Sequence, residues 1–118
     1  MPISNNDKRE ITRRLLRTKQ KAHDLEITLL FDGKTEEAKG VAEKAAALST
    51  QIDVLLGQMM NEWLGEGLSI IEDIKRTNVS LQASIRQIEQ GLNLANNLAR
   101  ALGFIDDALN IGRRLLSV

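Results

Sequence analysis

The sequence predicts an all-α fold, an antiparallel bundle of three long helices with room for a short fourth helix near the C-terminus. Three observations predict it. The only proline of the 118 residues is Pro2, so no ring-locked residue interrupts a later helix. Residues that favour helices, above all Ala, Leu, Glu, Gln, Lys and Arg, dominate the rest. Apolar side chains recur at alternating steps of four and three, the heptad spacing of coiled-coil-like packing.

Length and composition indicate a single helical-bundle domain over residues 1–118. A chain of 118 residues can bury one modest core and is too short for two ordinary domains. The apolar share of 42% and the charged share of 27% are typical of globular proteins. No cysteine is present, which excludes disulfides and thiolate ligands or nucleophiles.

The first two helices are expected to form a hairpin over about residues 7–31 and 36–63. Asp7 can cap the first helix, with Glu10 at the spacing of a capping box. Glycine in the FDGK stretch favours the left-handed conformation that ends many helices. The two seams of this hairpin comprise Ile11, Leu15, Thr18, Ala22, Leu25 and Leu29 on the first helix, then Ala38, Val41, Ala45, Leu48, Ile52, Leu55 and Met59 on the second.

A joint is expected at Trp63, Gly65 and Gly67, because two glycines so close together stop or bend a helix. A third helix would follow over about residues 69–102, where the heptad continues without a skip. At 1.5 Å per residue it would span roughly 50 Å, against about 42 Å for the second helix. Either a short fourth helix over about 104–116 returns after Gly103, or the third helix projects and buries its apolar stripe against another chain.

Both alternatives leave apolar surface that a second copy could cover, so we expect a homodimer through the third helix. A buried asparagine in a helical seam can fix register by pairing with its equivalent in a partner helix, as Asn78 would here. Alternatively, Asn78 reaches solvent or the backbone of a loop. The expected association surface consists of Ile71, Ile74, Asn78, Leu81, Ile85, Ile88 and Leu92.

The net charge of zero conceals an uneven distribution. Residues 1–21 carry seven basic against two acidic residues, whereas residues 22–74 carry three against eleven. A cationic patch of the first helix, beside its apolar seam, could bind phosphates of nucleic acid or anionic lipid. No tyrosine or phenylalanine interleaves with it, so nucleic-acid binding is not favoured, and pairing with acidic residues of the second helix or of a partner is the alternative. The patch comprises Arg13, Arg14, Arg17 and Lys21.

Enzymatic sites are not indicated, and we expect no catalytic residue, metal or cofactor. Glycine-rich phosphate loops and nucleophile motifs are missing from the sequence. The single histidine, His23, has Asp24 and Glu26 nearby, and we expect neither on its own face of the helix. Adjacent carboxylates such as Glu72 and Asp73 diverge by about 100° on a helix and cannot share a pocket.

Trp63-Leu64-Gly65 between two long helices resembles the motif of the small WxG secreted proteins. Members of that family are helical hairpins that carry the motif in the turn, pair as dimers and leave the cell through a specialised secretion system. The resemblance implies a hairpin of the second and third helices. This chain differs in having a helix before that hairpin and no tyrosine for the export signal of the family.

The function that these patterns favour is that of a non-enzymatic helical interaction or scaffold protein, which self-associates and binds an unidentified protein partner. The alternatives are binding of nucleic acid or an anionic surface through the basic first helix, and a WxG-like secreted protein. The MPISNNDKRE start lacks the apolar stretch of a signal peptide, and no run of about 18 apolar residues occurs. We therefore expect a cytoplasmic protein without a transmembrane segment, and export without a signal peptide stays open.

Overall fold

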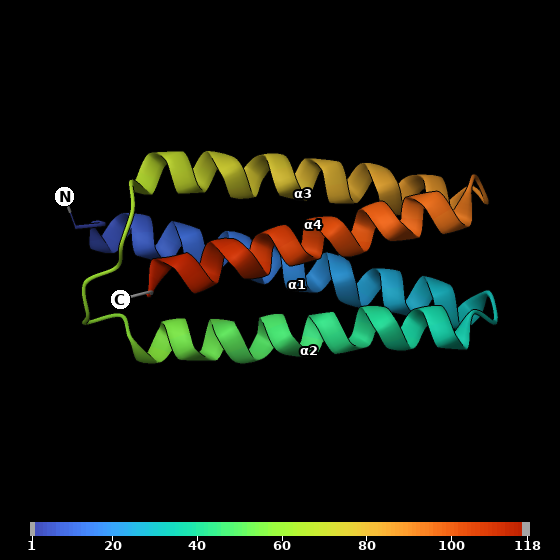
Figure 1. Cartoon of the computed structure of the whole chain (residues 1–118), viewed down its shortest axis with the longest axis horizontal. Helices are drawn as coiled ribbons and strands as arrows, with labels where there is room; N and C mark the ends of the chain where they lie inside the picture. The colour runs from blue at the N-terminus through green and yellow to red at the C-terminus, as the bar shows by residue number, and fades with distance from the viewer. Residues whose placement is uncertain (1, 117–118) are drawn as a thin grey trace.

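Four helices form the fold in the computed structural model, which describes residues 2–116. They are α1 (Asn5–Phe31), α2 (Thr35–Gly57), α3 (Gly67–Glu89) and α4 (Leu94–Leu115). They run along one long axis in a body of 46 × 22 × 20 Å (Figure 1). No strand occurs in the described residues, so the all-α prediction is confirmed. The prediction of three long helices is wrong, because there are four, and coiled-coil packing of the seams stays a prediction.

The expected third helix over 69–102 divides at a turn that the heptad pattern concealed. Helix α3 ends at Glu89, and Gly91 takes a φ of 74°, the left-handed conformation. The N–H of Leu92 donates to the carbonyl of Gln87 at 2.9 Å, and that of Gly91 to Ile88 at 3.0 Å. This is a Schellman motif, which satisfies carbonyls that the helix end leaves open. Helix α4 therefore begins at Leu94 and passes through Gly103, where one of the two alternatives placed a break.

The turn between α1 and α2 repeats the same motif at the same end of the bundle (Figure 1). Gly33 has a φ of 73°, and the N–H of Lys34 donates to the carbonyl of Leu29 at 2.8 Å. Here the glycine was expected to end the helix, and it does. The start of α1 differs from expectation, because Ser4 is the N-cap and accepts a hydrogen bond from the N–H of Asp7.

The two hairpins, α1 with α2 and α3 with α4, lie against each other so that α1 neighbours α3 and α2 neighbours α4. In both of these pairs the helices run in the same direction (Figure 1). Helices α2 and α3 make no contact within the described residues and occupy opposite corners of the bundle. The chain must therefore cross the end of the bundle diagonally between Gly57, where α2 ends, and Gly67.

Trp63 and Lys8 hold this crossover, residues 58–66, against the bundle. Helix α2 was expected to reach Trp63, but it ends six residues earlier, and the indole lies fully buried in the crossover. Its Nε1 donates to the carbonyl of Gln58 at 3.0 Å. The buried Lys8 of α1 places Nζ 5.6 Å from the centroid of the Trp63 ring. The same Nζ donates to the carbonyls of Met59 at 2.9 Å and Asn61 at 2.6 Å, so one ammonium satisfies two carbonyls of the crossover.

The core consists of two apolar clusters along the long axis, each with contributions from all four helices. The cluster at the crossover end contains Trp63, and the other lies toward the two Schellman turns. On α1 the clusters meet between Leu15 and Ala22, and on α3 between Ile74 and Leu81. The buried polar residues Thr18 and Asn78 lie in these two intervals.

The seam that was expected to bind a second copy is covered within its own chain. Its members Ile71, Ile74, Asn78, Leu81, Ile85 and Ile88 are all buried in the single chain. Leu92, the seventh, lies in the turn and is 50% exposed. The correction follows from the turn at Gly91, because it returns α4 along α3 and covers the stripe that a longer helix would have left open.

A close contact joins the parallel helices α2 and α4. The side chain of Gln51 donates from Nε2 to the carbonyl of Leu109 at 2.8 Å. A Cβ at Gly112 would clash with the side-chain amide of Gln51, so the glycine makes room for this amide. Lys44 Nζ and Asp106 Oδ1 form an ion pair of 2.6 Å between the same two helices.

Replacing Lys8 by methionine tests the anchoring of the crossover. Lys8→Met keeps an unbranched side chain but removes the donor to both carbonyls, and we expect a loss of about 2 kcal/mol in the free energy of unfolding, measured with urea. Lys39→Met, which changes an exposed lysine of α2, is the control and should shift stability by less than about 0.5 kcal/mol. Equal effects of the two substitutions would contradict an anchoring role.

Candidate functional site

A groove of about 550 Å³ between α1 and α3 gathers cationic side chains from both helices. Five cationic side chains line it, Arg14, Arg17, Lys21, Lys75 and Arg86. No carboxylate is part of its lining. The remaining lining residues, Asn78, Val79, Gln82 and Ala83, come from α3.

Helical spacing explains why these cations share one groove. Residues three or four positions apart lie on the same face of a helix, as Arg14, Arg17 and Lys21 do on α1. Lys75 and Arg86 are separated by three turns of α3. Because α1 and α3 lie side by side in the same direction, the two cationic faces border one groove.

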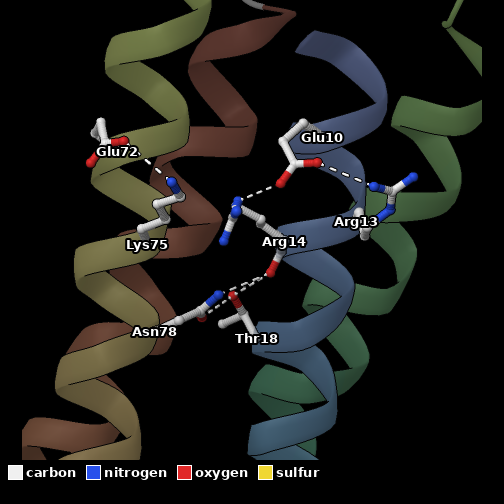
Figure 2. Close-up of polar contacts among 7 residues, drawn as sticks. All are labelled: Glu10, Arg13, Arg14, Thr18, Glu72, Lys75 and Asn78. Carbon is white, nitrogen blue, oxygen red and sulfur yellow. Dashed lines mark hydrogen bonds and ion pairs between the residues drawn. The ribbon is translucent and has the colours of Figure 1, made fainter. Parts of the chain in front are cut away.

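Two of the five cations lie close to a carboxylate, which partly neutralises their charge. Arg14 Nε lies 2.7 Å from Glu10 Oε1, and Lys75 Nζ lies 3.4 Å from Glu72 Oε1 (Figure 2). Both carboxylates come from the same helix as the cation, one turn earlier. These pairs leave Arg14 and Lys75 with less capacity for an external anion.

The other three cations have no carboxylate partner. Lys21 Nζ donates to the neutral amide of Gln82 at 2.7 Å, which leaves its charge in place. The guanidinium groups of Arg17 and Arg86 form no ion pair or hydrogen bond within residues 2–116. These arginines can each offer a fork of N–H donors to a carboxylate or phosphate.

A buried polar contact joins α1 to α3 beside the groove (Figure 2). Thr18 Oγ1 donates to Asn78 Oδ1 at 2.6 Å, and Asn78 Nδ2 donates to the carbonyl of Arg14 at 3.1 Å. Asn78 is 8% exposed, as expected of a core position. Both of its partners belong to α1 of the same chain. Asn78 therefore pairs neither with a second Asn78 nor with solvent or a loop, the two alternatives that the sequence left open.

Three of the four basic residues predicted as an anion-binding patch line the groove. The fourth, Arg13, points away from α3 in Figure 2 and lies 3.3 Å from Glu10. Lys75 and Arg86 were missed, because they lie eleven residues apart on another helix and form no run of charge with the basic residues of the first helix. Only the packing of α3 against α1 places them beside the cations of the first helix.

The remaining polar features do not form a comparable site. His23 is exposed, and its Nδ1 lies 3.5 Å from Glu26 Oε1. The expectation that Glu26 would lie off its face is wrong, since residues i and i+3 share a helix face. The α3/α4 groove mixes charges, with Asp73, Asp107, Arg76 and Arg114 in its lining.

Metal ligands and membrane spans were also sought in the structure. Residues 2–116 contain no group of three or more His, Cys, Asp or Glu side chains that could hold a metal ion. Among the helices of the described chain, none has the length and apolar character needed to cross a membrane.

No protein-family model, no curated protein and no solved structure matches this chain. The resemblance to WxG proteins therefore rests on Trp63-Leu64-Gly65. The hairpin that it implies is absent from residues 2–116, because α2 and α3 occupy opposite corners and do not touch. In this chain the tryptophan belongs to a diagonal crossover.

A double-mutant cycle tests the contact between Thr18 and Asn78. We expect Thr18→Val and Asn78→Leu to show a coupling of about 1 kcal/mol in the free energy of unfolding, because each removes one partner of the same hydrogen bond. Thr50→Val with Asn78→Leu is the control pair, since Thr50 lies exposed on α2 and donates to its own helix. Additive effects for Thr18 and Asn78 would contradict the contact.

Proposed function

We propose that this chain is a non-enzymatic helical interaction protein that binds an anionic macromolecular partner in the α1/α3 groove. The observation that carries the proposal is the groove's lining of five cationic and no acidic side chains. Clustered cations of this kind attract anionic partners and accelerate their association.

The main alternative for the basic face, pairing with acidic residues of the bundle, accounts for only part of it. The carboxylates that contact Arg14 and Lys75 lie on the same helices as these cations. Arg17 and Arg86 have no such partner in the described chain. Charge without a partner at the surface favours an external ligand.

Self-association stays a prediction, and its proposed surface has to change. The α3 seam contacts α1 and α4 of its own chain, so it offers no apolar stripe to a second copy. A homodimer would need another exposed surface. Binding of an anionic partner does not depend on this point, because the groove is formed within one chain.

Retention on immobilised heparin, a general polyanion, tests the proposal. We expect the double variant Arg17→Gln, Arg86→Gln to elute at clearly lower salt than the parent protein. Without these two contacts, binding to heparin releases fewer counterions. The control is Lys39→Gln, Arg100→Gln, which removes the same charge at exposed positions of α2 and α4. It should elute later than the groove variant and close to the parent.

One outcome of the elution experiment would overturn the proposal, and a measurement of stability is its control. Elution of the groove variant and the control at the same salt concentration would overturn it, because retention would then follow net charge alone. All three proteins should unfold at nearly the same urea concentration, since the four changed side chains are exposed.

A further inference from the structure

We infer that the occupant of the α1/α3 groove is an acidic amphipathic helix of a partner protein, a choice that rests on the proposed function and adds the partner's chemistry. Helix-in-groove recognition uses an elongated groove, exposed apolar surface for the apolar face of the guest and polar contacts beside it. The groove provides each of these.

The shape of the groove fits a helix. Its walls are two neighbouring helices that run in the same direction. From Lys75 to Arg86 it follows α3 for about 16 Å, the rise of three helical turns. A guest helix of three to four turns would lie along its full length.

The α3 wall of the groove also offers exposed apolar side chains beside its cations. Val79 is 71% exposed and, with the small and exposed Ala83, belongs to the lining from α3. The amides there are already engaged, Asn78 with Thr18 and Gln82 with Lys21. A ligand therefore finds exposed apolar surface on α3 next to cations that have no carboxylate partner.

The borders of the groove define the charge of the guest. Arg17 and Lys21 lie on the α1 side and Arg86 on the α3 side, and none of them contacts a carboxylate of the described chain. Carboxylates on both sides of a guest's apolar stripe could reach these cations. Glutamate and arginine can then form bidentate hydrogen bonds.

Nucleic acid fits the groove less well. Proteins that bind single strands stack bases on aromatic side chains, and no aromatic residue belongs to this lining. Recognition of double-stranded DNA inserts a protruding helix or strand into a groove, whereas this site is concave.

The test uses the full chain and two designed, fluorescein-labelled peptides of about 18 residues, long enough for helix formation. One peptide has a leucine stripe flanked by glutamates, and the other has serine in place of leucine with the same charge. We expect the leucine peptide to bind at least about tenfold more tightly, because only it can bury apolar surface against Val79 and Ala83. A single-stranded oligonucleotide of equal charge should bind more weakly than the leucine peptide.

Val79→Ser provides the matched change in the protein. It should weaken binding of the leucine peptide about fivefold and leave elution from heparin unchanged, since no charge is altered. Leu68→Ser, which changes another exposed apolar residue of α3 outside this groove, is the control and should leave peptide binding unchanged.

Failure of this inference is distinguishable from failure of the proposed function. Equal affinity for the two peptides, tighter binding of the oligonucleotide, or equal effects of Val79→Ser and Leu68→Ser would overturn the acidic helix as occupant. The proposed anionic partner would still stand on the heparin result. If the groove variant and its control elute together from heparin, both conclusions fail.

Discussion

The arrangement of the bundle depends on how the chain crosses from α2 to α3. A hydrogen-bonded turn would have placed these helices side by side, but residues 58–66 instead carry the chain to the opposite corner. Lys8 satisfies two carbonyls of the crossover, and Trp63 fills the end of the core beneath it. Hydrogen bonds from a charged donor are stronger than neutral ones, so these contacts stabilise the diagonal path.

The diagonal path has a consequence for the surface. It places α1 beside α3 in the same direction, and this pairing brings cations that lie more than fifty residues apart in the sequence to one groove. The Thr18–Asn78 contact joins the two walls between the apolar clusters of the core. A buried hydrogen bond at that level favours one alignment of α1 on α3, because a shift along the axis would leave an amide unpaired.

Composition and the heptad spacing sufficed to predict the helical class and the FDGK turn, because both depend on local preferences. The equivalent EQGL turn was missed, although Gly91 has nearly the same φ as Gly33, because Leu92 and Ala95 continue the apolar spacing through it. In the structure both are exposed. For the groove, the α1 cations were visible as a run of charge. Lys75 and Arg86 were not, since their role depends on which helices become neighbours, and that depends on long-range packing rather than on local spacing.

The neighbour relation of α1 and α3 can be measured directly, because the chain contains no cysteine and engineered thiols react alone. Lys21→Cys with Gln82→Cys replaces two side chains whose polar atoms lie 2.7 Å apart, and a short bis-maleimide should crosslink them within one chain. Glu43→Cys with Gln82→Cys places the two thiols on α2 and α3, at opposite corners of the bundle. This pair should not crosslink within the chain. A crosslink of residues 43 and 82 within one chain, or a crosslink of residues 21 and 82 only between chains, would contradict the diagonal crossover and the groove that follows from it.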